Sequence, residues 1–258
     1  MTSQQTQQPH PGESKLNNLP RAKIVKREDF TDDLFIVWLE TGVPFSFKAG
    51  QYITIGAGGL ERPYSIASAP SEPLIELFIE YIWPEYGGKL TPLLWAQHVD
   101  DIVSMRPKPK GIFTFKPKYR DHVMVGTVTG IAPYVSVIRQ YLKDGLEGHR
   151  FFFMEGASYQ NEFIYDKELS ALEERYPDWI KFVPTVSRPQ HEHNASWQGA
   201  KGRVNNIVEE HLEIWGLNKD ETLVSLCGHP GMIEDLKERL LPKGWSIEEE
   251  RFWKDEDE

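Results

Sequence analysis

The chain has almost no cysteine and no long apolar segment, and both absences narrow what it can be. Its single cysteine, Cys227, excludes an intrachain disulfide, an all-cysteine zinc site and a self-contained iron–sulfur cluster. No uninterrupted apolar run approaches the roughly 18 residues of a membrane span, and the polar start of the chain lacks the apolar core of a secretory signal. We therefore expect a cytoplasmic enzyme with no membrane insertion. Its 258 residues allow one large domain or two of ordinary size.

The acidic residues are concentrated in the second half of the chain. The net charge is −10, yet residues 1–120 carry 14 basic and 13 acidic side chains, whereas residues 121–258 carry 15 and 26. Such an asymmetry indicates two units with different partners. Residues 106–120 contain six cations and no acid, which predicts either a docking face for an acidic protein or an edge strand guarded by Lys and Pro. No nucleic-acid-binding motif accompanies this segment, so we expect no nucleic-acid partner.

The first part of the chain predicts a small β-barrel. Residues 1–19 are polar and rich in Gln and Pro, which is typical of a disordered tail. Residues 20–117 contain short apolar runs broken by Gly and Pro, the pattern of an antiparallel six-stranded barrel with one helical stretch at residues 91–98. The strands are expected at residues 22–27, 34–39, 51–55, 63–67, 74–82 and 102–106.

The pattern changes after a boundary at residues 116–121. Within residues 118–258, buried-type strands alternate with helical periodicity, which predicts a parallel-sheet α/β domain. Strands are expected at residues 122–127, 150–155, 180–186 and 222–227, and helices at residues 132–142, 165–175, 204–211 and 231–241. The fold class is therefore a two-domain β + α/β arrangement, in which nucleotides bind at the C-terminal ends of the parallel strands.

Two motifs of the barrel fit a flavin and its diphosphate. Arg62-Pro63-Tyr64-Ser65 offers a guanidinium to a diphosphate, a flat ring for stacking and a hydroxyl to a ring nitrogen. Gly87-Gly88-Lys89-Leu90-Thr91 precedes the helical stretch, where two glycines permit close approach and a helix N-terminus attracts phosphate. Each motif also has an ordinary interpretation. Residues 62–65 could be side chains that alternate along an edge strand, and Thr91 could be the cap of a helix.

Two further motifs lie at predicted strand ends of the α/β domain. The segment Val125-Gly126-Thr127-Val128-Thr129-Gly130-Ile131-Ala132-Pro133 follows a strand and opens a helix, the usual place for a pyrophosphate, although it is not a G-x-G-x-x-G fingerprint. Ser187 and Arg188 follow the strand at residues 180–186, and Arg203 opens the next helix. These side chains could hold the 2′-phosphate that distinguishes NADP from NAD.

These motifs and the later Cys227-Gly228-His229-Pro230-Gly231-Met232 occur in an order that resembles the ferredoxin–NADP⁺ reductase family, above all its bacterial type. The resemblance extends from about residue 20 to the C-terminus. It implies an FAD-binding barrel followed by an NADP-binding α/β domain, the layout that the strand pattern also predicts. It further implies that NADPH gives a hydride to N5 of FAD and that the flavin passes single electrons to ferredoxin or flavodoxin.

The resemblance also implies roles for individual residues. FAD would be bound by Arg62, Pro63, Tyr64, Ser65, Phe78, Ile79, Glu80, Lys89, Leu90, Thr91, Thr129, Phe252 and Trp253. NADP would be bound by Thr127, Thr129, Gly130, Ser187, Arg188, Arg203, Cys227, Gly228, His229 and Pro230. Ser65, near the flavin N5, and Cys227, beside the nicotinamide, would be the catalytic residues.

The chain departs from the family pattern in three places. Val128 stands where the dinucleotide turn usually carries glycine, and the second α/β strand leads into Gly156-Ala157-Ser158-Tyr159 where bacterial relatives often have an arginine. Five further residues follow the aromatic pair Phe252-Trp253. The alternatives to the ferredoxin reductase are an NAD(P)H-dependent flavin or oxygenase reductase and a non-catalytic FAD-binding regulatory module.

The remaining expectations concern partners. His191-Glu192-His193 lacks the spacing and the further ligand of a metal site, so no metal is expected. Ferredoxin or flavodoxin is the expected partner of a monomeric enzyme. These carriers are usually acidic and this chain has a net charge of −10, so the two whole molecules do not attract each other. We therefore expect docking through a local group of cations near the flavin edge. The docking cations would be Lys108, Lys110, Lys116, Lys118 and Arg120.

Overall fold

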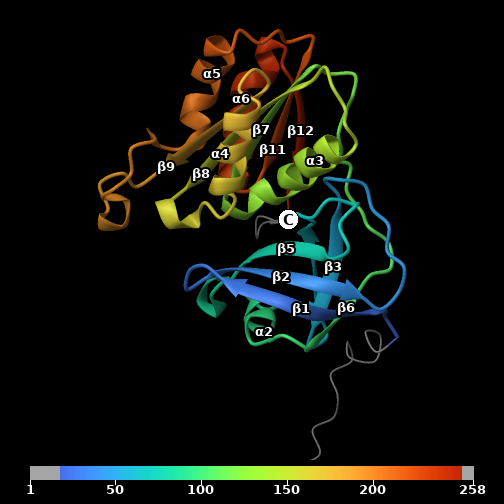
Figure 1. The fold of residues 1–258 in the computed structure, drawn as a ribbon. Helices are drawn as coiled ribbons and strands as arrows, with labels where there is room; N and C mark the ends of the chain where they lie inside the picture. Colours follow the sequence, from blue (N-terminus) through green and yellow to red (C-terminus); the bar gives the residue numbers. More distant parts are fainter. Residues whose placement is uncertain (1–17, 252–258) are drawn as a thin grey trace, which may run out of the picture.

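The computed structural model describes residues 18–251 and shows two six-stranded sheets, one above the other in Figure 1. The predicted aromatic pair Phe252 and Trp253 lies outside the described residues. Among residues 18–251, no helix is long and apolar enough to cross a membrane.

The first sheet is antiparallel and closes on itself. Its strands lie in the order β4-β3-β6-β1-β2-β5, and a bridge between Ile66, just after β4, and Leu77 of β5 joins the two edges. The strands are β1 (Arg21–Asp29), β2 (Leu34–Thr41), β3 (Tyr52–Ala57), β4 (Leu60–Ser65), β5 (Ile75–Glu80) and β6 (Ile102–Met105). The helix α2 (Thr91–Trp95) and the short 3₁₀ turn η1 (Pro84–Tyr86), which the sequence analysis missed, follow β5.

The second sheet is parallel where its strands pair and has the order β10-β9-β8-β7-β11-β12. Its strands are β7 (Asp121–Thr127), β8 (Arg150–Ala157), β9 (Ile180–Val186), β10 (Ala200–Lys201), β11 (Thr222–Cys227) and β12 (Ser246–Glu250). The helices are α3 (Ala132–Lys143), α4 (Asp166–Arg175), α5 (Val204–Ile214) and α6 (Pro230–Leu240), with 3₁₀ turns η2 (Val128–Ile131), η3 (Gln160–Glu162), η4 (Glu192–Asn194) and η5 (Leu241–Lys243). The predicted fold class is confirmed, while β10 and β12 were missed because one has two residues and the other carries three glutamates.

Helices cover both faces of the parallel sheet (Figure 1). Along β8, Phe151 and Phe153 pack in the cluster that contains α3 and α4 residues, whereas Phe152 and Met154 pack against residues of α5 and α6. Because successive strand residues point to opposite faces and helices cover both faces, the run from Phe151 to Met154 is apolar without interruption. Strand β2 shows the same alternation, since Phe35 lies inside the barrel and Ile36 faces the second unit.

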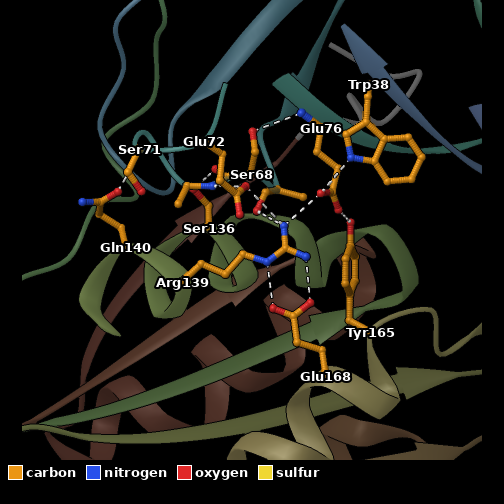
Figure 2. Close-up of polar contacts among 12 residues, drawn as sticks. Trp38, Ser68, Ser71, Glu72, Glu76, Ser136, Arg139, Gln140, Tyr165 and Glu168 are labelled. Carbon is orange, nitrogen blue, oxygen red and sulfur yellow. Dashed lines mark hydrogen bonds and ion pairs between the residues drawn. The ribbon is translucent and has the colours of Figure 1, made fainter. Parts of the chain in front are cut away.

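A buried polar network fastens the two units together (Figure 2). The Glu76 carboxylate of β5 is 5% exposed and accepts hydrogen bonds from Arg139 of α3 at 2.9 Å and from the Tyr165 hydroxyl at 2.7 Å. Arg139 also donates to both carboxylate oxygens of Glu168 in α4 at 2.7 Å. A buried charge needs such pairing, so these contacts set how the barrel sits against the α/β unit. The boundary predicted near residues 116–121 falls between β6 and β7; the domain limits themselves stay a prediction.

Candidate functional site

A cleft of about 950 Å³, open mouth included, lies at the junction of the two units. The barrel contributes most of the lining, and two strand ends of the α/β unit contribute the rest. The lining residues are Arg62, Pro63, Tyr64, Ser65, Phe78, Glu80, Ile82, Gly87, Gly88, Lys89, Leu90, Thr91, Thr129, Gly130, Cys227 and Gly228. Ile82 is the lining side chain that sequence reasoning did not select.

Strand β4 brings the tetrapeptide of residues 62–65 to this cleft. Arg62 is exposed, while Ser65 is 8% exposed and its hydroxyl has no hydrogen-bond partner among the described residues. An unpaired buried hydroxyl costs about 1–3 kcal/mol, so its position fits a partner supplied by a bound molecule. Burial also raises the pKa of Tyr64, opposed by Arg62, which keeps its ring a neutral phenol suited to stacking.

Strand β5 alternates at the cleft wall. The side chains of Phe78 and Glu80 line the cleft, but Ile79 is 1% exposed and packs inside the barrel. The side chain of Ile79 therefore does not face the cleft, as the period of two along a strand requires. Burial raises the pKa of Glu80 to about 7, and the carboxylates of Asp33 and Glu162 add to the shift.

The glycine-rich loop after β5 makes a tight turn beside the cleft. Gly87 has φ +86°, and a Cβ at Gly88 would lie 1.8 Å from the Ile82 carbonyl oxygen, so this close approach requires glycine. The hydroxyl of Thr91 accepts from the Ile82 amide at 2.9 Å. The helix-cap alternative for Thr91 is wrong, because Leu90 occupies the N-cap and no side chain caps α2.

The α/β unit faces the cleft with the adjacent C-terminal ends of β7 and β11. The His229 amide donates to the Thr127 hydroxyl at 2.8 Å, and Gly228 has φ +121° at the same crossing. A Cβ at Gly130 would lie 2.4 Å from the Cys227 carbonyl oxygen. The His229 imidazole caps α6 by accepting from the Gly231 amide, with Pro230 next to it. The structure thus brings together the predicted residues of both turns.

Two groups in this region carry chemical consequences. Val128 has φ +45°, the left-handed conformation in which a β-branched residue is strained. Valine in place of the glycine expected at this turn therefore costs backbone strain.

The Cys227 thiol is 1% exposed, and burial raises its pKa, with Glu250 adding to the shift. Cys227 is therefore a neutral thiol rather than a thiolate.

The predicted phosphate-binding residues lie apart from the cleft, at the end of β9. Arg188 is exposed and donates to the Tyr159 hydroxyl at 2.7 Å. Arg203 is the N-cap residue of α5, and the preceding Gly202 amide donates to the Val186 carbonyl, which places Arg203 next to the end of β9. Ser187 and both arginines thus gather where a parallel sheet binds nucleotides.

The basic segment of residues 106–120 is only partly available. Arg106 pairs with Glu61, Lys116 with Glu248 at 3.6 Å and Arg120 with Glu221 at 3.6 Å. The edge-strand alternative is wrong, since the described segment forms a single bridge, between Lys110 and Tyr52. Lys108, Lys110 and Lys118 are exposed, and no ion pair of theirs appears among residues 18–251.

Comparison with known proteins decides the family. Residues 124–238 match the family "Oxidoreductase NAD-binding domain". A flavodoxin/ferredoxin–NADP reductase of Buchnera aphidicola is 27% identical over 92% of this chain and 100% of its own. Ferredoxin–NADP reductase B of Sorangium cellulosum is 31% identical over 76% of this chain and 80% of its own. This chain belongs to the ferredoxin–NADP reductase family.

A solved structure supports the same fold for this reductase-family chain. A ferredoxin NADP⁺ reductase from Neisseria gonorrhoeae with bound FAD and NADP has a TM-score of 0.76 at 24% identity and covers 90% of this chain and 98% of its own. The predictions of family, fold class and enzyme class are therefore confirmed. The roles of individual residues stay predictions.

Proposed function

We propose that this chain is an FAD-containing reductase that takes electrons from NADPH and passes them singly to ferredoxin or flavodoxin. NADP is printed in the names of the related reductases, and the Neisseria gonorrhoeae reductase was solved with bound FAD and NADP. The observation that carries the proposal is the cleft where Ser65 and Tyr64 of the barrel face Cys227 and Gly228 at a strand end of the α/β unit. Such a cleft holds two ring systems together between the units.

The residues of the barrel would hold the flavin. Arg62 and the loop at Lys89 bind the diphosphate, Tyr64 packs on the isoalloxazine, and the unpaired Ser65 hydroxyl hydrogen-bonds near its N5. When bound, FAD supplies the redox chemistry, because it accepts two electrons as a hydride and releases them one at a time. Tyr64 and Phe78 cover the ring face and exclude water from the site.

The residues of the α/β unit would orient NADPH. The turn at Thr127–Gly130 accommodates the pyrophosphate, while the tied ends at Thr127 and His229 position the nicotinamide. Cys227 contributes as a neutral thiol that borders the nicotinamide. The hydride carries its own electron pair and needs no acid–base dyad, and the one proton that remains after both electrons have passed to the carrier would leave to solvent.

Anaerobic titration of the purified yellow protein with NADPH tests this function. Flavin bleaching at one equivalent, followed by reduction of ferredoxin or flavodoxin, is the expected result, and the released flavin should be FAD. Stoichiometric FMN contradicts the diphosphate assignment. Reduction of free flavins but of neither protein favours the flavin reductase, and inertness with both nicotinamides favours the regulatory module.

The carrier would dock through exposed cations near the flavin edge, in a cytoplasmic, monomeric enzyme. Lys110 bridges Tyr52, which in turn pairs with Ser65, so this lysine lies about two strand spacings, roughly 10 Å, from the cleft. Lys116 and Arg120 are held by acidic partners of the α/β unit and are better suited to fastening the connecting segment.

The docking site is tested by charge reversal. Lys108→Glu with Lys118→Glu should slow ferredoxin reduction severalfold at low salt and less at high salt, because salt screens such fields. Reduction of a small neutral dye by NADPH should stay unchanged. Equal loss of both activities would mean that the segment is structural, and no loss would mean that the carrier docks elsewhere.

A further inference from the structure

Glu80 places a carboxyl group in the wall of the cleft. It is the last residue of β5 and lies two positions after Phe78, on the same face of the strand. Glu76, two positions before Phe78 on that face, is held by Arg139 and Tyr165. Glu80 is half-buried, and no hydrogen bond or ion pair of its side chain appears among residues 18–251. Glu76 is thus engaged in pairing, whereas the carboxyl group of Glu80 can bind and release a proton.

The charged groups that act on Glu80 are acidic. Burial raises the pKa of Glu80 to about 7, and the carboxylates of Asp33 and Glu162 add to the shift. Asp33 lies between β1 and β2, and Glu162 belongs to η3, so the two act on Glu80 from different units. Each of them accepts hydrogen bonds from its own neighbours. The remaining ionisable side chains that line the cleft are Arg62, Tyr64, Lys89 and Cys227. Glu80 therefore changes its protonation state near neutral pH.

The position of Glu80 separates it from a second carboxyl group that also titrates near neutral pH. Burial raises the pKa of Glu250 to about 7, and Glu248 adds to the shift. Glu250 pairs with Cys227 in the sheet but does not line the cleft. Of the described residues that line the cleft, Glu80 alone carries a carboxyl group. A charge that appears in the cleft therefore acts most directly on Glu80.

Reduction of a flavin changes the charge of this cleft. A hydride brings two electrons and one proton, so the cleft gains one negative charge when the proposed flavin accepts it. A new negative charge raises the pKa of a carboxyl group in the same low-dielectric site, because it opposes ionisation. A group that already titrates near pH 7 then takes up a proton. Because Glu80 is only half-buried, solvent can supply that proton.

We propose that Glu80 is a proton-binding site coupled to the flavin, which takes up a proton from solvent when the flavin is reduced and returns it when the electrons leave. The inference rests on the proposed function, because it needs a flavin in this cleft. The Glu80 carboxylate forms one O–H bond on uptake and breaks it on release, and no electron moves at Glu80. This proton is additional to the one that the hydride carries. Its uptake neutralises one charge in the cleft and so favours reduction as the pH falls.

Spectroelectrochemical titration of the FAD-loaded protein between about pH 6 and about pH 9 tests this assignment without NADPH. The electrode supplies the electrons, and the change of the flavin midpoint potential with pH reports the protons that are taken up. The test variant is Glu80→Gln, which keeps the size of the side chain but cannot ionise. Glu85→Gln, at an exposed acid of η1, is the matched control, and Glu250→Gln tests the second carboxyl group with a raised pKa.

Above pH 7 the potential of the wild-type protein should fall with pH up to about twofold more steeply than that of Glu80→Gln. The two potentials should agree near about pH 6, where Glu80 is already mostly protonated, and Glu85→Gln should follow the wild type. Equal slopes in the wild type and Glu80→Gln, a constant offset between them at every pH, or the same change in Glu85→Gln or in Glu250→Gln alone would overturn the assignment.

Loss of the flavin from Glu80→Gln would also overturn it, because the carboxyl group would then hold the cofactor rather than respond to its charge. A wild-type protein that binds no flavin, or whose flavin NADPH does not reduce, refutes the proposed function and is a separate result.

Discussion

The two halves of the site are built differently. The half that we propose for the flavin, called the flavin half below, is a walled cleft in which Tyr64, Phe78 and Ser65 are half-buried or buried. The half that we propose for the nucleotide, called the nucleotide half below, consists of exposed side chains, Arg188 and Arg203 among them, at loops that follow strand ends. This difference suits a cofactor that stays bound on one side and a nucleotide that exchanges on the other. A ligand enclosed by a cleft dissociates slowly, whereas a ligand held by exposed charged side chains dissociates quickly.

Both halves of the site depend on the contact between the two units. Breaking this contact should therefore have the largest effect, a loss of free energy of unfolding. Arg139→Met should lower the free energy of unfolding by about 3–5 kcal/mol, because it leaves the buried Glu76 carboxylate without its charged partner. Denaturant unfolding measures the change. Arg106→Met, which removes an exposed ion pair with Glu61, should have a much smaller effect. Similar losses in both variants would mean that the buried Glu76–Arg139 pair stabilises the protein no more than an exposed ion pair does.

The flavin half should fail selectively when its cationic residue is removed. Arg62→Ala should weaken flavin binding about ten- to a hundredfold, the value of a charged hydrogen bond of about 1.5–3 kcal/mol. Flavin fluorescence after ultrafiltration measures the released fraction. Affinity for 2′-phospho-AMP should stay the same, and a parallel loss would mean that the two halves are not independent.

The nucleotide half should show the reverse selectivity. Arg188→Ala should raise the KM for NADPH about ten- to a hundredfold and leave that for NADH almost unchanged, because only NADPH carries the 2′-phosphate. Steady-state dye reduction with each nicotinamide provides the comparison, and flavin content should not change. An equal rise for both nicotinamides would mean that Arg188 contacts another part of the nucleotide.

The smallest expected effect is on how the stability of the protein changes with pH, through the partly buried Glu80 of the cleft. Because the pKa of Glu80 in the folded protein is raised to about 7, its stabilising contribution is complete below about pH 4.5 and is lost as the pH rises through 7. Glu80→Gln should therefore reduce the loss of stability between about pH 5 and pH 8 by about 1–2 kcal/mol.

Denaturant unfolding across this pH range measures the change. Some slope should remain, because burial also raises the pKa of Glu250 to about 7. Glu85→Gln, at an exposed acid of η1, is the control. An unchanged slope in Glu80→Gln would mean that Glu80 is ionised in the folded protein near neutral pH.

Local patterns in the sequence predicted most elements. The alternating runs of the barrel and the β–α alternation after residue 120 correspond to β1–β9, β11 and the four helices α3–α6, with shifts at their ends. The motifs at residues 62–65, 87–91 and 227–230 also gather around the junction, because each lies at the end of a predicted strand or beside one. These signals are short in sequence range, which is why reading along the chain could detect them.

What the sequence could not predict depends on residues that are distant along the chain. It predicted the motifs, their order and the two-unit fold by itself. Only the tertiary structure decided that Glu76 and Arg139, 63 positions apart, would fasten the units, that Lys116 would pair with Glu248, and that Asn194, in the loop after β9, would bond to Ser158 at the end of β8. The physical reason is that burial and charge pairing arise between elements, and a sequence pattern reports only the preferences within each element.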